Sequence, residues 1–336
     1  MNHPVETAAV WRGRELFDRP DWQWPLTSDD AAELQAAHAA TASLPLEHIT
    51  RQRFELPGLS ARLDGLQHSL EHGSGVTMVR GLPVDSYSAQ DAMRIFYGIA
   101  QHLGTPVSQT PAGDRVFHVR DEGFHEKDAR ARGPNTRKKL SFHTDRCDVI
   151  AFCCLKQAKS GGENCVVSSA ALYNEVLARR PDLLVELLQP FYYQRHNVDT
   201  GNDLAYCRQP VFSFRDGHFA ASFLRVLIER AYRSPDIPDM RAEQREALDY
   251  LEALADDPAL HVSFRQEPGD MLFLNNWVTF HRRAEFEDYV AVEQKRHLLR
   301  IWLSVPNSRP LDPCFLDNYG AVEAGAVRGG MRPRLE

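Results

Sequence analysis

The amino-acid sequence predicts a mainly β fold with added helices, of the β-sandwich or jelly-roll kind. Many short apolar, β-branched runs are typical of strands, and turns rich in glycine and proline separate them. The helical segments stand at the start of the chain or between strands, without the regular alternation of βαβ units. The motifs GxGxxG and GxxxxGK[ST] are absent, so the two commonest nucleotide-binding folds have no support in the sequence.

The first third of the chain is expected to mix helices with two strands. Ser28 and the two aspartates after it precede an alanine-rich segment, a pattern typical of a capped helix start. The run VTMVRGLP at 76–83 predicts a strand that enters a turn. A helix is expected from about Ser88 to His102, where Gly-Thr-Pro ends it, and VFHVRD at 116–121 predicts a second short strand.

The middle of the chain begins with a predicted long loop. Residues 123–139 are polar, rich in arginine and lysine, and contain Gly-Pro. Two apolar strands are expected next, VIAFCCL at 149–155 and CVVSS at 165–169, joined by a turn with two glycines. A helix capped by Ser168 or Ser169 should follow, and Pro181 suits the first turn of the helix after it.

The rest of the chain predicts further strands around one more helix. FYYQRH, YCRQPVFSF and HFAASF have strand composition, and an Arg-Asp-Gly hairpin turn joins the last two. Apolar residues at helical spacing across 239–255 predict a helix. Three more strands are expected at 261–266, 271–276 and 296–305.

These elements divide the chain into three expected parts. Residues 1–75 form a helical lead-in that packs on the core, and 76–305 form the jelly-roll domain. That domain carries helical inserts at about 169–189 and 225–257. Residues 306–336 form an irregular tail rich in proline, glycine and arginine.

Composition narrows the classes of function and partner. The chain has 39 lysines and arginines against 46 aspartates and glutamates, a net charge of −7, which argues against a nucleic-acid-binding surface. It has no run of 18 apolar residues that would cross a membrane. The start lacks the pattern of a secretory signal, and the six cysteines form no CxxC, so we expect a cytoplasmic protein with reduced thiols. A small-molecule partner is expected, and the sequence leaves homo-oligomer formation open.

A His-x-Asp pair is the first candidate for metal chemistry. In an extended segment residues i and i+2 point to the same side, so His143 and Asp145 are placed to hold one ion together. The chain has 14 histidines, and this is its one His-x-Asp or His-x-Glu. The alternative is a structural histidine hydrogen-bonded to a nearby carboxylate.

A distal histidine and two arginines complete the set of candidate site residues. His281 follows the Pro-Gly-Asp turn and the strand MLFLNN, and Arg296 and Arg300 lie in the strand RHLLRIWLS. Residues four apart on a strand share a face, so both guanidiniums are expected to face one cavity. A buried arginine needs an anion, and a carboxylate suits it best. The alternative is an internal ion pair with a protein carboxylate.

At this point the sequence resembles the TauD/TfdA-like branch of the Fe(II)- and 2-oxoglutarate-dependent dioxygenases. The resemblance covers roughly residues 76–305 and rests on the order and spacing of MVRGLP, LGTPVSQ, FHTDRCD, SGGEN, PGDMLFLNN leading to FHRR, and RHLLR. It implies a double-stranded β-helix, the jelly roll of clavaminate synthase-like enzymes.

The resemblance also implies roles for individual residues. His143, Asp145 and His281 would be the three iron ligands, and Arg296 would bind the distal carboxylate of 2-oxoglutarate. Asn164 stands at the position of a second co-substrate contact, where the family commonly has threonine. Arg300 matches a position that holds an anionic substrate group in some relatives, and it could equally assist Arg296.

The implied activity is oxidation, by default hydroxylation, of an unactivated C–H bond in a small polar substrate, amino-acid-like or carboxylate-bearing. The reaction would use Fe(II) as its cofactor, consume 2-oxoglutarate and O2, and release succinate and CO2. Phe142, beside the first ligand, is a candidate substrate contact. Two other functions would use the same three ligands: a metal-dependent jelly-roll isomerase or hydrolase, and a non-catalytic sensor of metal and a carboxylate ligand.

Overall fold

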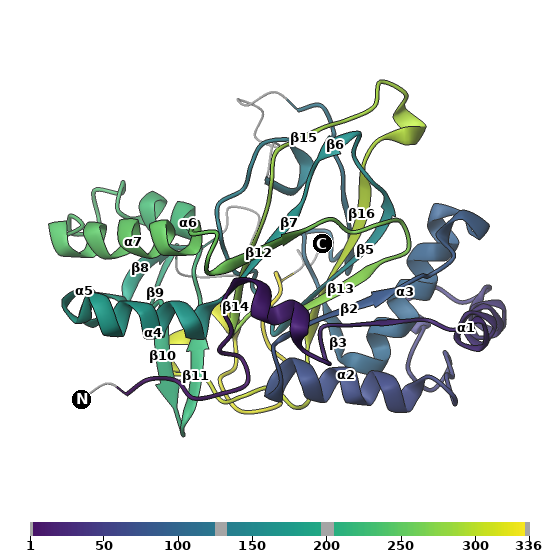
Figure 1. Cartoon of the computed structure of the whole chain (residues 1–336), viewed down its shortest axis with the longest axis horizontal. Helices are drawn as coiled ribbons and strands as arrows, with labels where there is room; N and C mark the ends of the chain where they lie inside the picture. The colour runs from purple at the N-terminus through teal and green to yellow at the C-terminus, as the bar shows by residue number, and fades with distance from the viewer. Residues whose placement is uncertain (1–2, 125–132, 196–204, 333–336) are drawn as a thin grey trace.

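Two facing β-sheets form the centre of the computed structural model, which describes residues 3–124, 133–195 and 205–332 (Figure 1). In the larger sheet the strand order is β1–β2–β13–β5–β16–β3, and β4 also pairs with β16. All of these pairs are antiparallel except β1 with β2. The strands are β1 (Gln23–Pro25), β2 (Val76–Arg80), β3 (Thr105–Val107), β4 (Val116–Val119), β5 (Val149–Lys156), β13 (Met271–Asn275) and β16 (His297–Ser304).

The smaller sheet has the order β12–β7–β14 and packs against the larger one. A buried apolar cluster fills the space between them, with Ile150, Leu272 and Trp302 from the larger sheet and Val166 and Val262 from the smaller. Since β13 is buried along its whole length, the inner strands need apolar residues on both faces. The strands are β7 (Asn164–Ser168), β12 (His261–Phe264) and β14 (Thr279–Arg283), and the pair β6 (Ser160–Gly161) with β15 (Phe286–Glu287) extends this end.

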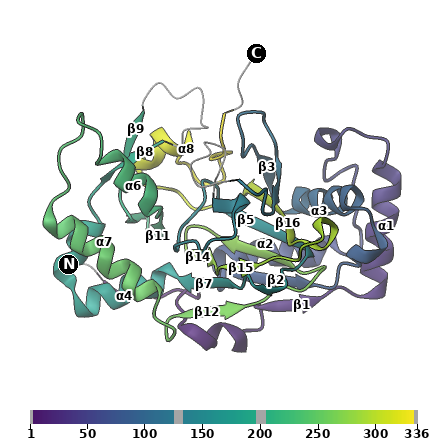
Figure 2. The ribbon, with the colours of Figure 1, turned by 90° about the horizontal axis from the view of Figure 1, so that it is seen from above.

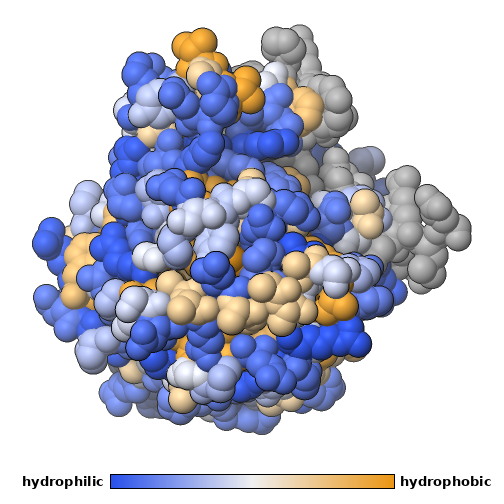
Figure 3. All heavy atoms as spheres, turned by 90° about the vertical axis from the view of Figure 1, so that its right-hand side faces the viewer, coloured by the Kyte–Doolittle hydropathy of each residue, from blue (hydrophilic) through white to orange (hydrophobic). Residues whose placement is uncertain are grey.

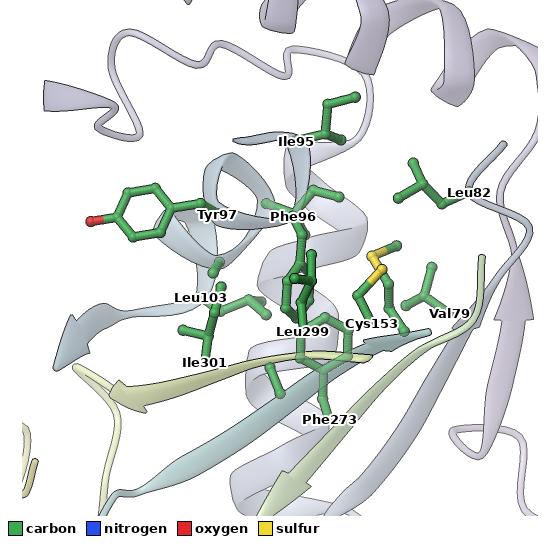
Figure 4. Packing of buried hydrophobic residues seen from close by; sticks show 14 of the residues in the cluster. Val79, Leu82, Ile95, Phe96, Tyr97, Leu103, Cys153, Phe273, Leu299 and Ile301 are labelled. Carbon is green, nitrogen blue, oxygen red and sulfur yellow. The ribbon is translucent and has the colours of Figure 1, made fainter. Parts of the chain in front are cut away.

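Three N-terminal helices cover the outer face of the larger sheet: α1 (Ser28–Thr41), α2 (Ser60–His72) and α3 (Ala89–Leu103). Side chains of α3 such as Phe96 and Leu103 meet Phe273, Leu299 and Ile301 of the sheet in one buried cluster (Figure 4). The outer surface on this side is mostly hydrophilic (Figure 3). The apolar residues of these helices therefore stabilise the sheet from one side.

A second helical layer covers the smaller sheet on the opposite side of the molecule (Figure 2). It contains α4 (Ser169–Arg179), α5 (Pro181–Leu187), α6 (Arg225–Ala231) and α7 (Ala242–Ala255). Two hairpins complete it, β8 (Phe191–Gln194) with β9 (Tyr206–Gln209) and β10 (Phe212–Arg215) with β11 (His218–Ala221). The short helix α8 (Leu316–Tyr319) lies against β9.

Short 3-10 helices occur in the connections, and they are η1 (Gly13–Asp18), η2 (Leu46–His48), η3 (Val84–Ser86), η4 (Gly133–Asn135), η5 (Val292–Gln294) and η6 (Pro313–Phe315). Within the three described ranges, no helix is both long and apolar enough to span a membrane.

The structure differs in detail from the expected elements. Residues 1–75 supply a strand as well as helices, because β1 pairs in parallel with β2 at the edge of the larger sheet. The insert at 225–257 contains two separate helices, α6 and α7, rather than one. In the tail, η6 and α8 add short helical turns to an otherwise irregular segment.

The packing of α3 on the sheet yields a stability prediction. Phe273 is fully buried in the cluster of Figure 4, so Phe273→Ala should lower the free energy of unfolding by about 3–5 kcal/mol. Urea denaturation followed by circular dichroism measures this. Val290→Ala is the control, because Val290 is 99% exposed and its loss should change stability by less than about 0.5 kcal/mol.

Candidate functional site

The structure brings His143, Asp145 and His281 together at one end of the sheets. His281 belongs to β14, whereas His143 lies in an irregular segment before β5. An isolated antiparallel bridge joins them: the backbone N–H of each residue donates to the carbonyl oxygen of the other at 3.0 Å. Their imidazole rings lie 4.5 Å apart between centroids. One ligand atom from each of the three residues lies within 4.8 Å of the others.

The segment that carries Asp145 is held by side chains from the turn between β13 and β14. Asn276 Oδ1 accepts a hydrogen bond from the Asp145 N–H at 3.2 Å, and its amide donates to Cys147 Sγ at 3.0 Å. Thr144, buried between the two site residues, donates its N–H to the carbonyl of Phe223 at 2.7 Å. These contacts fix the backbone on both sides of Asp145.

One oxygen of Asp145 is already engaged. Arg300 Nη1 donates to Asp145 Oδ2 at 3.1 Å, and Trp302 Nε1 donates to the same oxygen at 3.0 Å. The other carboxylate oxygen is therefore the one left for a metal ion. Arg300 is itself held by Gln109, whose Oε1 accepts from Nε at 2.8 Å.

The surroundings keep Asp145 and His281 in their metal-binding protonation states. Burial raises the pKa of Asp145, but the charge of Arg300 and the neighbouring imidazoles outweigh it and hold the pKa below its usual value. Burial lowers the pKa of His281 to about 3, so its imidazole is neutral at pH 7. A neutral imidazole and an ionised carboxylate are the forms that bind metal.

Arg296 is a buried cation without a carboxylate partner among the described residues. It is 2% exposed, and neither its Nε nor its Nη1 has a hydrogen-bond partner there. Burial lowers its pKa to about 10, so the guanidinium is still charged at pH 7. Its flat face lies over the ring of Phe286, 5.1 Å from the centroid. Such a group calls for an anion.

The two arginines have different partners. On β16, Leu298, Arg300 and Trp302 alternate with residues that face α3, so these three point into the space between the sheets, and Arg296 lies directly before the strand. Arg300 is in the ion pair with Asp145, whereas Arg296 has none with a described residue. The internal ion pair that the sequence left open is therefore found at Arg300.

A cavity of about 860 Å³ opens beside the cluster and is bordered by His143, Asp145, Arg300 and Trp302. Arg296 does not border it and lies four residues before Arg300, directly ahead of β16. Helices α6 and α7 supply charged residues to the wall. There Arg225 pairs with Glu229, Asp249 and Glu252, at distances of 2.9, 2.5 and 2.9 Å.

Two further predicted site residues have structural contacts. Asn164 begins β7, and its amide Nδ2 donates to Gln266 Oε1 at 2.9 Å. Phe142 borders the cavity, but its ring also packs 5.6 Å from the ring of His261 and under the guanidinium of Arg282. The roles expected for both residues stay predictions.

Sequence reasoning did not assign Trp302 or Arg146 to the site. The position of Trp302 two residues after Arg300 on one strand face was the available signal. In a regular strand, Arg146 would point to the opposite side from Asp145. The segment 144–148 is not a strand, and Arg146 borders the same cavity.

The chain matches a known protein family over most of its length. The model of the family described as "Taurine catabolism dioxygenase TauD, TfdA family" matches residues 41–302. The chain is also similar to the FR-33289 synthase of Streptomyces rubellomurinus, with 32% identity over 338 residues, which cover 97% of this chain and 98% of the synthase.

Solved structures share the fold. An asparagine oxygenase in complex with Fe(II), 2S,3S-3-hydroxyasparagine and succinate superposes with a TM-score of 0.66 and 19% identity, over 91% of this chain and 99% of that one. The non-heme iron oxygenase OrfP in complex with Fe and alpha-ketoglutaric acid gives 0.62 and 15%, over 84% and 94%. The jelly-roll prediction is confirmed.

The contrast between the two arginines can be tested in the metal-free, ligand-free protein. Arg296→Met removes a buried charge that has no carboxylate partner among the described residues, so the free energy of unfolding should stay unchanged or rise by roughly 1–4 kcal/mol. Arg300→Met leaves the Asp145 carboxylate without its ion-pair partner and should lower the free energy of unfolding by about 3–5 kcal/mol. Urea denaturation at pH 7 compares the two variants. Equal destabilisation by both would contradict the assignment.

Proposed function

Because the chain belongs to the taurine catabolism dioxygenase TauD, TfdA family and is an Fe(II)- and 2-oxoglutarate-dependent dioxygenase, we propose that His143, Asp145 and His281 bind its iron. Two neutral imidazoles and one carboxylate suit Fe(II) and leave positions open for co-substrates. With 2-oxoglutarate and O2, the iron supplies the oxidant for a substrate C–H bond, and succinate and CO2 are released.

Arg296 is the observation that carries this proposal. Its guanidinium is buried, charged and without a described partner at Nε and Nη1, so it fits the distal carboxylate of 2-oxoglutarate. A metal-dependent isomerase or hydrolase would use the three ligands but would not require this second anion site. Asn164 keeps its predicted role as a co-substrate contact.

Arg300 and Trp302 are proposed to orient the Asp145 carboxylate. Both donate to Oδ2, so Oδ1 is the oxygen that would hold the iron. The predicted role of Arg300 in 2-oxoglutarate or substrate binding would be added to this one, since Arg300 also borders the cavity.

The substrate is proposed to be a small polar molecule, amino-acid-like or carboxylate-bearing, that is hydroxylated. The cavity carries both charges: Arg146 and Arg300 lie beside the cluster, and on α6 and α7 the carboxylates Glu229, Asp249 and Glu252 outnumber Arg225 and Arg230. A zwitterion fits such a surface better than a nucleic acid or a lipid. Similar folds in the asparagine oxygenase and in OrfP bound to (3S)-hydroxy-L-Arg agree with this class.

The first test is spectroscopic. Anaerobic addition of Fe(II) and 2-oxoglutarate to the wild-type protein should produce a metal-to-ligand charge-transfer band in the visible range. His143→Ala and Asp145→Ala should lose the band and the 2-oxoglutarate-dependent release of succinate. His118→Ala is the control, because this histidine pairs with His297 outside the cluster and should leave both signals intact. A folded wild-type protein without the band would overturn the proposal.

The second test addresses Arg296. Loss of a charge-assisted contact should raise the Kd of 2-oxoglutarate roughly 10- to 100-fold in Arg296→Met, measured by titration of the charge-transfer band. Lys159→Met serves as the control because it removes an exposed cation that is paired with Glu287. An unchanged Kd in Arg296→Met would remove Arg296 from the co-substrate site.

A further inference from the structure

A second buried arginine, Arg283, lies beside the proposed co-substrate residues. It belongs to β14, two residues after His281, and it is 6% exposed. In the antiparallel pairing of β14 with β7, Arg283 stands directly opposite Asn164. The side chains of two opposite residues lie on the same face of the sheet, with their Cβ atoms about 5 Å apart. Arg283 is therefore a neighbour of a candidate 2-oxoglutarate contact.

The ring of Phe286 links Arg283 to Arg296. The Cζ of Arg283 lies 4.7 Å from the centroid of this ring, and the Cζ of Arg296 lies 5.1 Å from it. Gly162 packs against the same group, because a Cβ there would lie 3.2 Å from Arg296 Nε and 3.4 Å from Phe286 Cβ. We call Asn164, Arg283, Phe286 and Arg296 the arginine cluster. It places two buried guanidiniums against one aromatic ring.

Arg283 has neutral hydrogen-bond partners and no ion pair among the residues that the structure describes. Its Nε donates to the carbonyl oxygen of Ala284 at 3.3 Å, and its Nη2 donates to the carbonyl oxygen of Lys138. Asp121 interacts electrostatically with Arg283 but forms its ion pair with Arg137, at 3.1 Å. A guanidinium keeps its proton at neutral pH, so the cluster contains two cations that repel each other.

Asp288 places one negative charge beside the arginine cluster. Its Oδ1 accepts from the backbone N–H of Arg296 at 2.8 Å, whereas its Oδ2 is buried and has no hydrogen-bond partner in the described part of the chain. The carboxylate interacts electrostatically with Arg283 and with Arg296. One carboxylate against two guanidiniums leaves one positive charge in excess. That excess matches the charge of one further carboxylate.

We propose that Arg283 and Asp288 set the affinity for the distal carboxylate of 2-oxoglutarate through their charges, Arg283 by attracting it and Asp288 by repelling it. This inference rests on the proposed function, because it takes Arg296 as the residue that binds this carboxylate. The weak dielectric screening of a buried site lets a charge act beyond hydrogen-bond distance. The cluster then selects a 2-oxo acid with a charged far end over one with an apolar far end.

Arg283 also holds the segment that leads to His143, so a purely structural role needs to be separated from the charge role. The carbonyl oxygen of Arg283 accepts from the Leu140 N–H at 3.0 Å, and its Nη2 bonds Lys138. Loss of this attachment would disturb every 2-oxo acid that binds at the iron. Loss of the charge would weaken only an acid that carries a distal carboxylate.

The test compares 2-oxoglutarate with 2-oxopentanoate, which has a methyl group in place of the distal carboxylate. Each acid is titrated anaerobically into the Fe(II)-loaded full chain. The Kd is measured from the charge-transfer band, or by displacement of 2-oxoglutarate where the band is weak. Arg283→Met should raise the Kd of 2-oxoglutarate about three- to tenfold and leave that of 2-oxopentanoate within about twofold. Arg283→Lys keeps the charge and should keep both values within about twofold of wild type.

Arg282→Met is the matched control from the same strand. Arg282 points to the other side of β14 and pairs with Asp256 at 3.2 Å. Its loss removes a neighbouring arginine without removing charge from the arginine cluster. Neither Kd should change by more than about twofold.

Asp288→Asn tests the same rule with the opposite sign. Asparagine keeps an oxygen that accepts from the Arg296 N–H, but the negative charge is lost. The Kd of 2-oxoglutarate should fall about three- to tenfold, while that of 2-oxopentanoate stays within about twofold. Structural damage would raise the Kd instead. If Arg283→Met fails to fold, Asp288→Asn still decides the proposal.

The outcomes separate this inference from the proposed function. The charge role is overturned if Arg283→Met weakens both acids equally or neither of them, or if Asp288→Asn fails to tighten 2-oxoglutarate. In these cases the assignment of Arg296 stands as long as Arg296→Met still weakens 2-oxoglutarate. An unchanged Kd in Arg296→Met, or a wild-type protein without the band, overturns the proposed function and this inference together.

Discussion

The backbone bridge between His143 and His281 is the constraint on which the site depends. It ties an irregular segment to β14 through two hydrogen bonds at 3.0 Å. A regular strand at 143–148 would direct Arg146 away from Asp145. Because the segment leaves β geometry directly after the bridge, both side chains reach one cavity. Two hydrogen bonds hold the segment in this geometry. Asn276, in the turn before β14, accepts from the Asp145 N–H, and the Thr144 hydroxyl oxygen accepts from the Phe223 N–H.

Buried charges are distributed unevenly around that bridge. Asp148, three residues after Asp145, accepts from Arg328, Trp277 and Ser304, and this network is closed within the protein. Arg300 and Asp145 form a second closed pair. Arg296 differs, since its Nε and Nη1 lack described partners. Stability alone would favour an apolar residue at this position, which supports the proposal that Arg296 binds an anionic ligand.

The sequence allowed much of the fold and the core of the site to be predicted. Apolar runs such as 149–155 and the Pro-Gly-Asp turn before β13 depend on local patterns, and the structure has strands there. The cluster of His143, Asp145 and His281 followed from spacing and resemblance, and the structure brings the three together. The pairing of β1 with β2, the partner of Arg300 and the direction of Arg146 depend on contacts between residues distant in sequence. Local pattern carries no signal for these.

The arrangement also separates the chemistry from recognition of the substrate. The candidate iron and 2-oxoglutarate residues lie inside 41–302, the region that matches the family. The cavity wall is built from connections, from α6 and α7, and from the segment after 302. A rigid sheet can keep a reactive centre constant while connections and termini vary in shape and charge. Arg146 stands at the junction of the two parts. Its backbone adjoins a metal-ligand candidate, and its guanidinium donates to Gly330 and Asn318 of the tail, so the tail shapes the cavity wall from outside the region that matches the family.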